Sequence, residues 1–542
     1  MTRPTNPILP GFNPDPSIVR VGDVYYVAAS TFEWYPGVAV HASTDLVNWS
    51  IAARPLDRAG LLDLRGRPDS GGVWAPCLTH ADGRFHLVYT DMIRHQGNYK
   101  DCRNYLTTAE RIEGPWSDPV YLNGSGFDPS LFHDEDGRKY LVNVLWDPFA
   151  PHPFTGIGLQ EYDPAARRLV GPVTNIFAGT ALAYTEAPHL YRRDGWYYLL
   201  TAEGGTWYDH ACTLARSRRI EGPYEVHPHN PILTSRDDPG ARLQRAGHGD
   251  IVESPDGRVY LVHLCSRRLG AVGHSTLGRE TAIQECEWRD DGWLHVLGGP
   301  VPSDSIGSLP PAEPLPDAVT YAFDTAPLHP DLLWLRTPES HRIFEVLPDR
   351  GGLRLYGRES LGSWNEVALV ARRQDVPACS VETLLSFSPD DPREGAGIIA
   401  YYSRHAFHAL CFTRNAARAP ALRIISSTAE TFRAPQVLVH EEPLPSDITR
   451  VGLRMQGNAD RVILSYRLTE TVPWKVLPQR LDGSILADEG GRAVGGGGFT
   501  GTFYGLFAYD LNGAGKPADF HHFTYRRDSV DEAGKSAAPF TG

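Results

Sequence analysis

One stretch near the amino terminus decides the fold: GFNPDPSIVRVGDVYYV, residues 11–27. It contains an acidic residue, a proline, a short apolar segment, a turn with glycine, and then an aromatic-rich segment. The turn residue Gly22 separates two segments rich in the β-branched and aromatic residues that favour strands. The stretch therefore predicts a β-hairpin whose first strand follows Asp15-Pro16.

The same pattern recurs four more times in the amino-terminal half of the chain. The copies begin at Ala75-Pro76, Asp128-Pro129, Ala187-Pro188 and, in a degenerate form, Gly249-Asp250. Their turn glycines are separated by 61, 54, 58 and 62 residues, and they are Gly22, Gly83, Gly137, Gly195 and Gly257. Each interval holds about four short strands. The repeat predicts a five-bladed β-propeller over residues 1–305, and a stack of β-sandwiches is the alternative.

A second β domain follows a proline-rich segment. Residues 306–319, IGSLPPAEPLPDAV, lack apolar periodicity and are predicted to be a linker. Beyond them, alternating apolar segments at 353–356, 381–385, 397–401 and 461–464 are cut by turns. This pattern favours an antiparallel β-sandwich over residues 320–542.

Composition excludes several classes of function. The 542 residues are 41% hydrophobic, and 52 basic against 65 acidic side chains give a net charge of -13. No basic stripe is available for nucleic-acid phosphates, so a neutral or small substrate fits better. We expect no membrane association and a cytoplasmic location, because no segment has the apolar length of a signal peptide or membrane span. The seven cysteines are widely spaced and form no C-x-x-C pair.

The propeller symmetry brings distant side chains together. Corresponding positions in the blades are related by rotation about one axis, so the residues just before each repeat's proline should meet at one mouth of the channel. They are Asp15, Trp74 (with Ala75), Asp128, Glu186 (with Ala187) and His248 (with Gly249). A single Asp-Pro is an ordinary turn signal, but three gathered carboxyls raise one another's pKa values, so that one stays protonated while another ionises. Hydrolysis of an acetal needs both forms, because one group protonates the leaving oxygen while another takes a proton from water.

The surroundings of the three acids favour a sugar. Aromatic side chains flank the axial positions, and they are Phe32, Trp74, Phe127, Trp146 and Trp207. Flat rings suit the C–H faces of a pyranose, and core packing is the alternative for each ring. Arg279 could bind sugar hydroxyls or a carboxylate, or simply pair with Glu280 or Glu285. His248 could organise water or a cation, or be an ordinary buried histidine.

Five segments together resemble a known enzyme family. They are GFNPDPS (11–17), STFEW (30–34), GFDPS (126–130), TEAPH (185–189) and LGRET (277–281). They resemble the β-xylosidases of glycoside hydrolase family 43, and the similarity spans essentially the whole chain. It implies a propeller followed by a jelly-roll, concanavalin-like sandwich. It also implies an exo-acting, inverting xylan 1,4-β-xylosidase that releases D-xylose from the non-reducing ends of short xylooligosaccharides. An α-L-arabinofuranosidase, or a dual enzyme, on the same scaffold is the alternative.

The resemblance also implies residue roles. Asp15 would be the general base, Glu186 the general acid, and Asp128 the residue that orients and tunes the acid. The residues that would line the sugar pocket are Phe32, Trp74, Phe127, Trp146, Thr206, His248 and Arg279. Phe503, in GTFYG (501–505), would be the aromatic that the second domain lends to close the pocket. A closed pocket would explain trimming from chain ends.

The remaining expectations concern ligands and partners. Some family members bind Ca²⁺ near the histidine that His248 matches, yet a lone histidine is a poor site for an ion that prefers about six to eight oxygens. We therefore expect no required cofactor. The resemblance implies a homo-oligomer, a tetramer or dimer. A non-catalytic carbohydrate-binding propeller would keep the aromatics without needing three axial acids, and a scaffold for protein partners would need no acid-lined channel.

Overall fold

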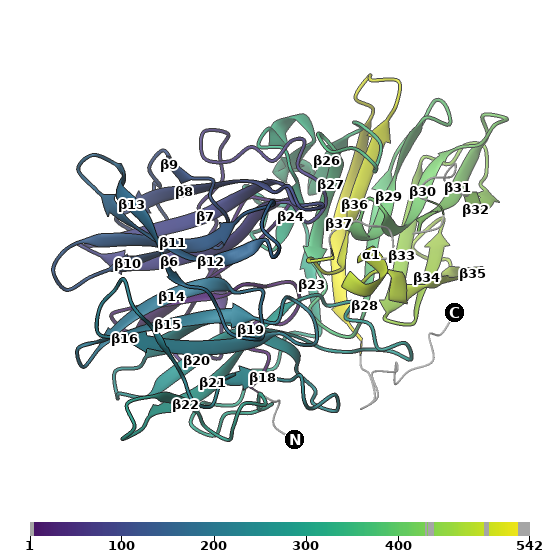
Figure 1. Cartoon of the computed structure of the whole chain (residues 1–542). Helices are drawn as coiled ribbons and strands as arrows, with labels where there is room; N and C mark the ends of the chain where they lie inside the picture. Colours follow the sequence, from purple (N-terminus) through teal and green to yellow (C-terminus); the bar gives the residue numbers. More distant parts are fainter. Residues whose placement is uncertain (1–4, 429–430, 432–437, 493–497, 529–542) are drawn as a thin grey trace.

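The computed structural model describes residues 5–428, 431, 438–492 and 498–528. Two β domains lie side by side, the propeller in purple to teal and the sandwich in green to yellow (Figure 1). The described helices are short, and they are α1 (Asp488–Arg492), η1 (Ser340–Arg342), η2 (Pro348–Arg350) and η3 (Gly483–Ile485). The predicted all-β fold with a five-bladed propeller and a β-sandwich is confirmed.

Each propeller blade is an antiparallel sheet built in chain order. Blade one contains β1 (Ser17–Val21), β2 (Val24–Ala29), β4 (Ala39–Ser43) and β5 (Ser50–Ala53), and blade two contains β6 (Gly72–Ala81), β7 (Arg84–Arg94), β8 (Asp101–Ala109) and β9 (Val120–Asn123). Blade three contains β10 (Ser130–His133), β11 (Lys139–Trp146), β12 (Phe154–Asp163) and β13 (Arg168–Phe177). Blade four contains β14 (Glu186–Arg193), β15 (Trp196–Glu203), β16 (Ala211–Ser217) and β17 (Glu225–Val226), and β18 (Leu233–Thr234) also pairs with β16. Blade five contains β19 (Gln244–Glu253), β20 (Val259–Ser266), β21 (Glu280–Trp288) and β22 (Leu294–Val296).

The innermost strands close the ring. Strands β1, β6, β10, β14 and β19 contact one another in that order, and β19 contacts β1. All five predicted turn glycines have positive φ, from 61° at Gly22 to 87° at Gly137. Glycine adopts this conformation without the steric cost that a Cβ brings, so the repeat of glycines reflects five equivalent hairpins.

The backbone at the axis corrects the alignment of the fifth repeat. The residue at the corresponding axial position of each blade is left-handed, and these residues are Asp15 (φ 56°), Ala75 (33°), Asp128 (52°), Ala187 (51°) and His248 (46°). His248 therefore corresponds to Asp15, and the fifth copy begins at His248 rather than at Gly249. The sequence pattern was misleading here because Gly249 stands where the other four copies have proline.

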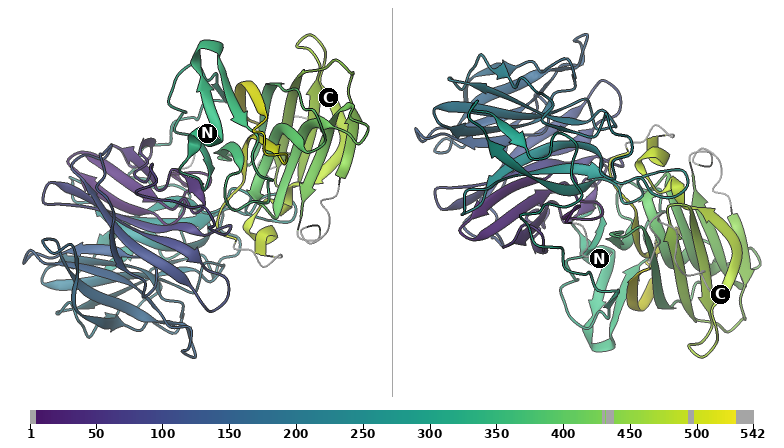
Figure 2. Two further views of the ribbon diagram at one scale, coloured as in Figure 1. Left: turned by 90° about the horizontal axis from the view of Figure 1, so that it is seen from above. Right: turned by 90° about the horizontal axis from the view of Figure 1, so that it is seen from below.

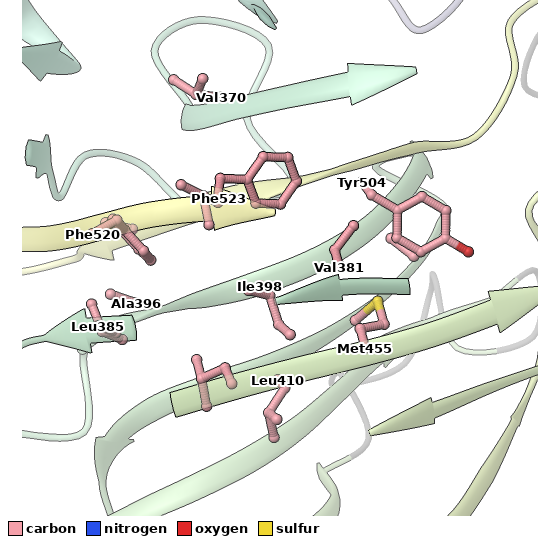
Figure 3. Close-up of a cluster of buried hydrophobic side chains, with 14 of the residues drawn as sticks. Val370, Val381, Leu385, Ala396, Ile398, Leu410, Met455, Tyr504, Phe520 and Phe523 are labelled. Carbon is pink, nitrogen blue, oxygen red and sulfur yellow. The ribbon is translucent and has the colours of Figure 1, made fainter. Parts of the chain in front are cut away.

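The carboxy-terminal domain is a sandwich of two eight-stranded sheets. One sheet contains, in spatial order, β25 (Phe344–Leu347), β26 (Gly352–Tyr356), β37 (Pro517–Arg527), β28 (Ala378–Ser386), β33 (Arg450–Asn458), β34 (Arg461–Arg467) and β35 (Lys475–Asp482), and β23 (Ala318–Tyr321) also pairs with β37. The other contains β3 (Trp34–Tyr35), β24 (Leu332–Leu335), β27 (Ala368–Arg373), β36 (Phe503–Asp510), β29 (Glu394–Ser403), β30 (Ala406–Arg414), β31 (Pro420–Ser427) and β32 (Leu438–Pro443). Apolar side chains such as Val381, Leu385, Ile398 and Leu410 fill the space between them (Figure 3).

A strand from the propeller region joins the sandwich. In β3, Trp34 pairs with Leu335 and Tyr35 pairs with Trp334 of β24. The two views of Figure 2 show the propeller and the sandwich meeting along one side. This shared sheet fixes how the second domain faces the propeller axis. Between β22 and β23, residues 297–317 form no strand. In the described part of the chain, no helix has the length and apolar character required to cross a membrane.

Candidate active site

A pocket of about 440 Å³ lies at the propeller axis and contains all three predicted acids. This volume is in the range of small-molecule sites. The predicted sugar-binding residues that line it are Phe32, Trp74, Phe127, Trp146, Thr206, His248 and Arg279. Blades one, three and four supply Asp15, Asp128 and Glu186, so the fold brings together carboxyls that are far apart in the chain.

Irregular backbone aims these side chains at the axis. The register of the inner strands is interrupted between Trp74 and Cys77 and between Glu186 and His189. In β19 it is interrupted on both sides of Gly247, and the second interruption spans His248. Such bulges bend a strand and redirect its side chains. Asp15 and Asp128 are left-handed, a conformation that aspartate tolerates better than most residues. The Asp-Pro motif therefore forms a local turn and also directs the aspartate carboxyl into the pocket.

Asp15 is buried, and the structure favours its ionised form. Its Oδ1 accepts a hydrogen bond from Arg279 Nη1 at 3.0 Å, and its Oδ2 accepts one from Ser30 Oγ at 2.6 Å. His248 Nδ1 lies 3.6 Å from Oδ1. Burial alone would raise the pKa of Asp15, but Arg279, His248 and the Ser30 hydroxyl together hold it below its ordinary value. Asp15 is therefore a carboxylate at neutral pH.

In contrast to Asp15, Glu186 and Asp128 have raised pKa values. Burial, followed by the negative charge of Asp15, raises the pKa of Glu186 to about 8, although Arg279 and Lys100 oppose the rise. Glu186 Oε1 is buried and has no hydrogen-bond partner within the described part of the chain. Burial and the nearby Glu186 also raise the pKa of Asp128 well above its ordinary value. The pocket thus holds a proton on this carboxyl pair beside an ionised Asp15.

Further contacts fix the acids in place. Asp128 Oδ2 accepts a hydrogen bond from the Ala187 N–H at 3.2 Å, which ties it to the residue next to Glu186. Glu203 is fully buried, and its Oε1 accepts hydrogen bonds from Thr185 Oγ1 at 2.9 Å and Thr180 N at 2.7 Å. These bonds hold the segment that leads into Glu186, so the Glu186 carboxyl has a defined position in the pocket.

Arg279 connects the acids of the pocket to the second domain. Its guanidinium lies 5.3 Å from the ring centroids of both Phe32 and Phe499. Its Nε and Nη2 donate to the Phe499 carbonyl at 3.3 and 3.2 Å. The alternative pairing with Glu280 or Glu285 is not formed, since Glu280 binds Arg267 and Arg279 binds Asp15.

The aromatic that the sandwich contributes is Phe499, which corrects the assignment of Phe503. Phe499 lines the pocket, and Phe503 does not. Phe503 begins strand β36, is fully buried, and stacks on Trp34 with ring centroids 3.7 Å apart. It also packs on Phe12, whose ring in turn contacts Phe32. Phe503 therefore supports the pocket wall from behind, and Phe499 forms part of the wall itself.

Sequence reasoning missed four side chains of the pocket: Lys100, Phe154, Tyr184 and Phe499. Lys100 Nζ lies 4.6 Å from the ring centroid of Trp146 and donates to the His95 carbonyl at 3.0 Å. Burial lowers the pKa of Lys100, while Glu186 opposes the decrease. None of the four occupies a repeated axial position, so the repeat gave no signal for them.

The residues around His248 do not fit Ca²⁺. Burial lowers the pKa of His248 to about 4, so its ring is neutral beside Asp15. In residues 5–428, 431, 438–492 and 498–528, no group of three or more His, Cys, Asp or Glu side chains is arranged to hold a metal. Ca²⁺ takes about six to eight oxygen ligands. The donor set at the axis falls short of that number.

Comparison with known proteins identifies the family. Residues 4–294 match Glycosyl hydrolases family 43, and residues 320–526 match the Beta xylosidase C-terminal Concanavalin A-like domain. The chain is 54% identical over 534 residues to Xylosidase/arabinosidase 43B of Humicola insolens, covering 97% of this chain and 98% of the relative. It is 44% identical over 535 residues to Beta-xylosidase of Bacillus subtilis (strain 168), covering 96% and 99%.

A solved structure shares the whole architecture. The crystal structure of xylan beta-1,4-xylosidase from Bacillus halodurans C-125 superposes with a TM-score of 0.92 at 46% identity, covering 97% of this chain and 100% of that chain. Family, fold and pocket chemistry agree. The chain belongs to glycosyl hydrolase family 43 and is a glycoside hydrolase.

Proposed function

We propose that this glycoside hydrolase is an exo-acting, inverting β-1,4-xylosidase that releases D-xylose from the non-reducing ends of short xylooligosaccharides. The observation that carries the proposal is the separation of protonation states in one pocket, with Asp15 ionised and Glu186 protonated near neutral pH. The names of the Bacillus subtilis relative and of the Bacillus halodurans structure support the xyloside substrate.

The proposed chemistry uses the two carboxyls on opposite sides of the scissile bond. Asp15 accepts a proton from water as the water oxygen attacks the anomeric carbon. Glu186 donates its proton to the departing glycosidic oxygen, so the leaving sugar is released as a neutral alcohol. Asp128 accepts the Ala187 N–H next to Glu186, so it orients the acid. Burial and their mutual proximity leave a proton on this carboxyl pair. A single displacement inverts the anomeric centre.

The shape of the pocket supports attack at chain ends. Arg279 and Phe499 occupy the side where the sandwich meets the propeller, and their contact joins the two domains. Trp74 and Phe127 pack edge to face with centroids 5.6 Å apart and form an aromatic surface in the same pocket. A terminal sugar can enter such a pocket, whereas an internal segment of a polymer would have to thread through the wall.

Arabinofuranosidase activity is the second candidate function. The Humicola insolens relative carries both activities in its name, Xylosidase/arabinosidase. An α-L-arabinofuranoside presents hydroxyls that the same three acids could contact. We propose that any such activity is secondary in this chain.

The proposal is tested by kcat/KM values on β-1,4-xylobiose, β-1,3-xylobiose and 4-nitrophenyl α-L-arabinofuranoside. The value on β-1,4-xylobiose should be the highest of the three. A higher value on the arabinofuranoside would make the arabinofuranosidase the main activity, and a higher value on β-1,3-xylobiose would overturn the proposed linkage.

We further propose that the enzyme acts in the cytoplasm and without a metal ion. All seven cysteines are free and buried, which supports a reducing compartment. Burial raises the pKa of several of these thiols, including Cys77 and Cys212 to about 12. Such thiols are unreactive at neutral pH.

A further inference from the structure

A second cavity, of about 670 Å³, lies between the two domains and shares no lining residue with the catalytic pocket. Its walls come from the amino-terminal segment, blade one, residues 312–316 and the sandwich. Two arginines face it from different domains. Arg54 follows β5 in the propeller, and Arg373 ends β27 in the sandwich.

Neither guanidinium has a carboxylate partner among the residues that the structure describes. Arg54 Nε and Nη2 donate only to the Pro330 carbonyl, at 3.1 and 2.9 Å. Arg54 Nη1 is buried without a hydrogen-bond partner. Arg373 Nη1 donates to the amide oxygen of Asn13. These two side chains therefore bring positive charge to the cavity without the usual compensation.

Two neighbouring arginines, in contrast, each have a carboxylate partner. Arg372 and Arg527 also line the cavity, and both bind the carboxylate of Asp375, at 2.5 and 2.6 Å. Asp331 lines the cavity as well, and its Oδ2 accepts the Tyr321 hydroxyl at 2.9 Å. The Asp375 carboxylate is thus already paired with Arg372 and Arg527.

The charges of Arg54 and Arg373 lower the pKa values of neighbouring basic groups. Burial, then the neighbouring Arg373, lowers the pKa of Arg54 to about 9, with Asp331 opposing. Burial and Arg372 lower the pKa of Arg373 to about 10, with Asp331 and Asp375 opposing. Burial and both arginines hold the pKa of His41 well below its ordinary value, so this cavity residue is neutral. Buried charges without partners are costly, and an anion would remove that cost.

We propose that the interdomain cavity binds a small organic oxyanion, a carboxylated or phosphorylated sugar, between Arg54 and Arg373. A guanidinium presents parallel N–H donors that match carboxylate and phosphate oxygens. Trp49, Ile51 and Leu315 supply an aromatic and apolar wall beside the two charges. The volume accommodates a monosaccharide with its anionic group. The bound anion bridges propeller and sandwich and stabilises their contact.

A chain of contacts also connects this cavity to the catalytic base. Asn13, which accepts from Arg373, donates its backbone N–H to the Arg279 carbonyl at 3.0 Å. Arg279 in turn pairs with Asp15. An anion that repositions Arg373 therefore acts on the segment that carries the catalytic base.

The test measures binding in the absence of any xyloside, so it is independent of the proposed hydrolase specificity. Thermal unfolding and titration calorimetry of the full chain are followed with D-glucuronate and, separately, with inorganic phosphate, at ionic strength held constant with NaCl. At least one of the two should raise Tm saturably. A response to glucuronate alone identifies a sugar carboxylate, and a response to phosphate identifies a phosphorylated ligand.

Variants assign the response to the cavity. Arg54→Gln and Arg373→Gln should each weaken the Kd by about tenfold or more, because each removes a charge-assisted hydrogen bond. Arg423→Gln is the matched control, since it also removes one positive charge, from an arginine paired with Glu441 in the sandwich. The absence of a saturable response in the wild type would overturn the proposal. That result is expected if a second copy of the chain fills the cavity. An unchanged Kd in both Arg54→Gln and Arg373→Gln would overturn it as well.

Discussion

Replacing Arg279 with methionine should change the pH at which the enzyme becomes active. Arg279 Nη1 lies 3.0 Å from Asp15 Oδ1, and both side chains are buried. In the wild type this contact, together with His248 and the Ser30 hydroxyl, outweighs the burial that would otherwise raise the pKa of Asp15. Methionine keeps an apolar stem between Phe32 and Phe499 but leaves the carboxylate beside Asp128 and Glu186 without its cation.

The size of the shift follows from electrostatics. Two unit charges about 4 Å apart at an effective dielectric constant of about 20 interact by about 4 kcal/mol. One pKa unit corresponds to about 1.4 kcal/mol, so the upper limit is about 3 units, within the range of about 1–3 units for a carboxylate beside arginine. Asp15 must be ionised to accept a proton. Its raised pKa therefore moves the acidic limb of the profile of kcat/KM to higher pH.

The assay is kcat/KM on xylobiose as a function of pH, at constant ionic strength. The acidic limb of Arg279→Met should lie about 1–3 pH units above that of the wild type. Loss of sugar contacts would lower the whole curve without moving the limb. Arg423→Met, which removes an arginine paired with Glu441 in the sandwich, serves as the control. An acidic limb that stays in place in Arg279→Met would refute the role of Asp15 as the base held ionised by Arg279.

Four further predictions concern the acid, its pH dependence, the pocket wall and metals. Glu186→Ala should lower kcat on xylobiose by about 10²–10⁴ while largely sparing a 2,4-dinitrophenyl xyloside, whose leaving group needs little protonation; equal losses would contradict the assignment. For the same reason, wild-type rates on xylobiose should fall as pH rises through about 8, where Glu186 loses its proton. Phe499→Ala should raise KM with little change in Tm, whereas Phe503→Ala should lower the free energy of unfolding by about 3–5 kcal/mol, because Phe503 is fully buried; the reverse pattern would return Phe503 to the pocket. Treatment with EDTA should leave kcat/KM unchanged, and a loss restored by Ca²⁺ would show that His248 belongs to a metal site.

The repeat made much of the site predictable from sequence. A blade places equivalent residues at one axis. Asp15 and Asp128 occupy equivalent positions and Glu186 directly precedes the equivalent Ala187, so the repeat was enough to bring the three carboxyls together. The same left-handed backbone recurs in all five blades, which explains why a local motif carried long-range information. The fifth copy was misaligned by one residue because Gly249 replaces the proline that marks the others.

Other features depend on contacts that have no local signature. Phe499 and Phe503 are four residues apart in one stretch, and only the start of strand β36 decides which ring faces the pocket. Lys100 reaches the site from a segment outside the repeated unit. The pair formed by Arg54 and Arg373 joins residues from different domains across a cavity. Side-chain direction and interdomain packing, rather than composition, determine these placements.

The central claim is that Asp15 and Glu186 act together in a single displacement on a β-xyloside. Proton NMR of the purified enzyme acting on β-1,4-xylobiose tests it most directly, because the first anomer of xylose is visible before mutarotation mixes the two forms. Initial release of α-xylose would establish both the substrate and the inversion that Asp15 as base to water requires. Initial release of β-xylose would contradict the mechanism, and cleavage of an α-L-arabinofuranoside with no hydrolysis of xylobiose would contradict the substrate.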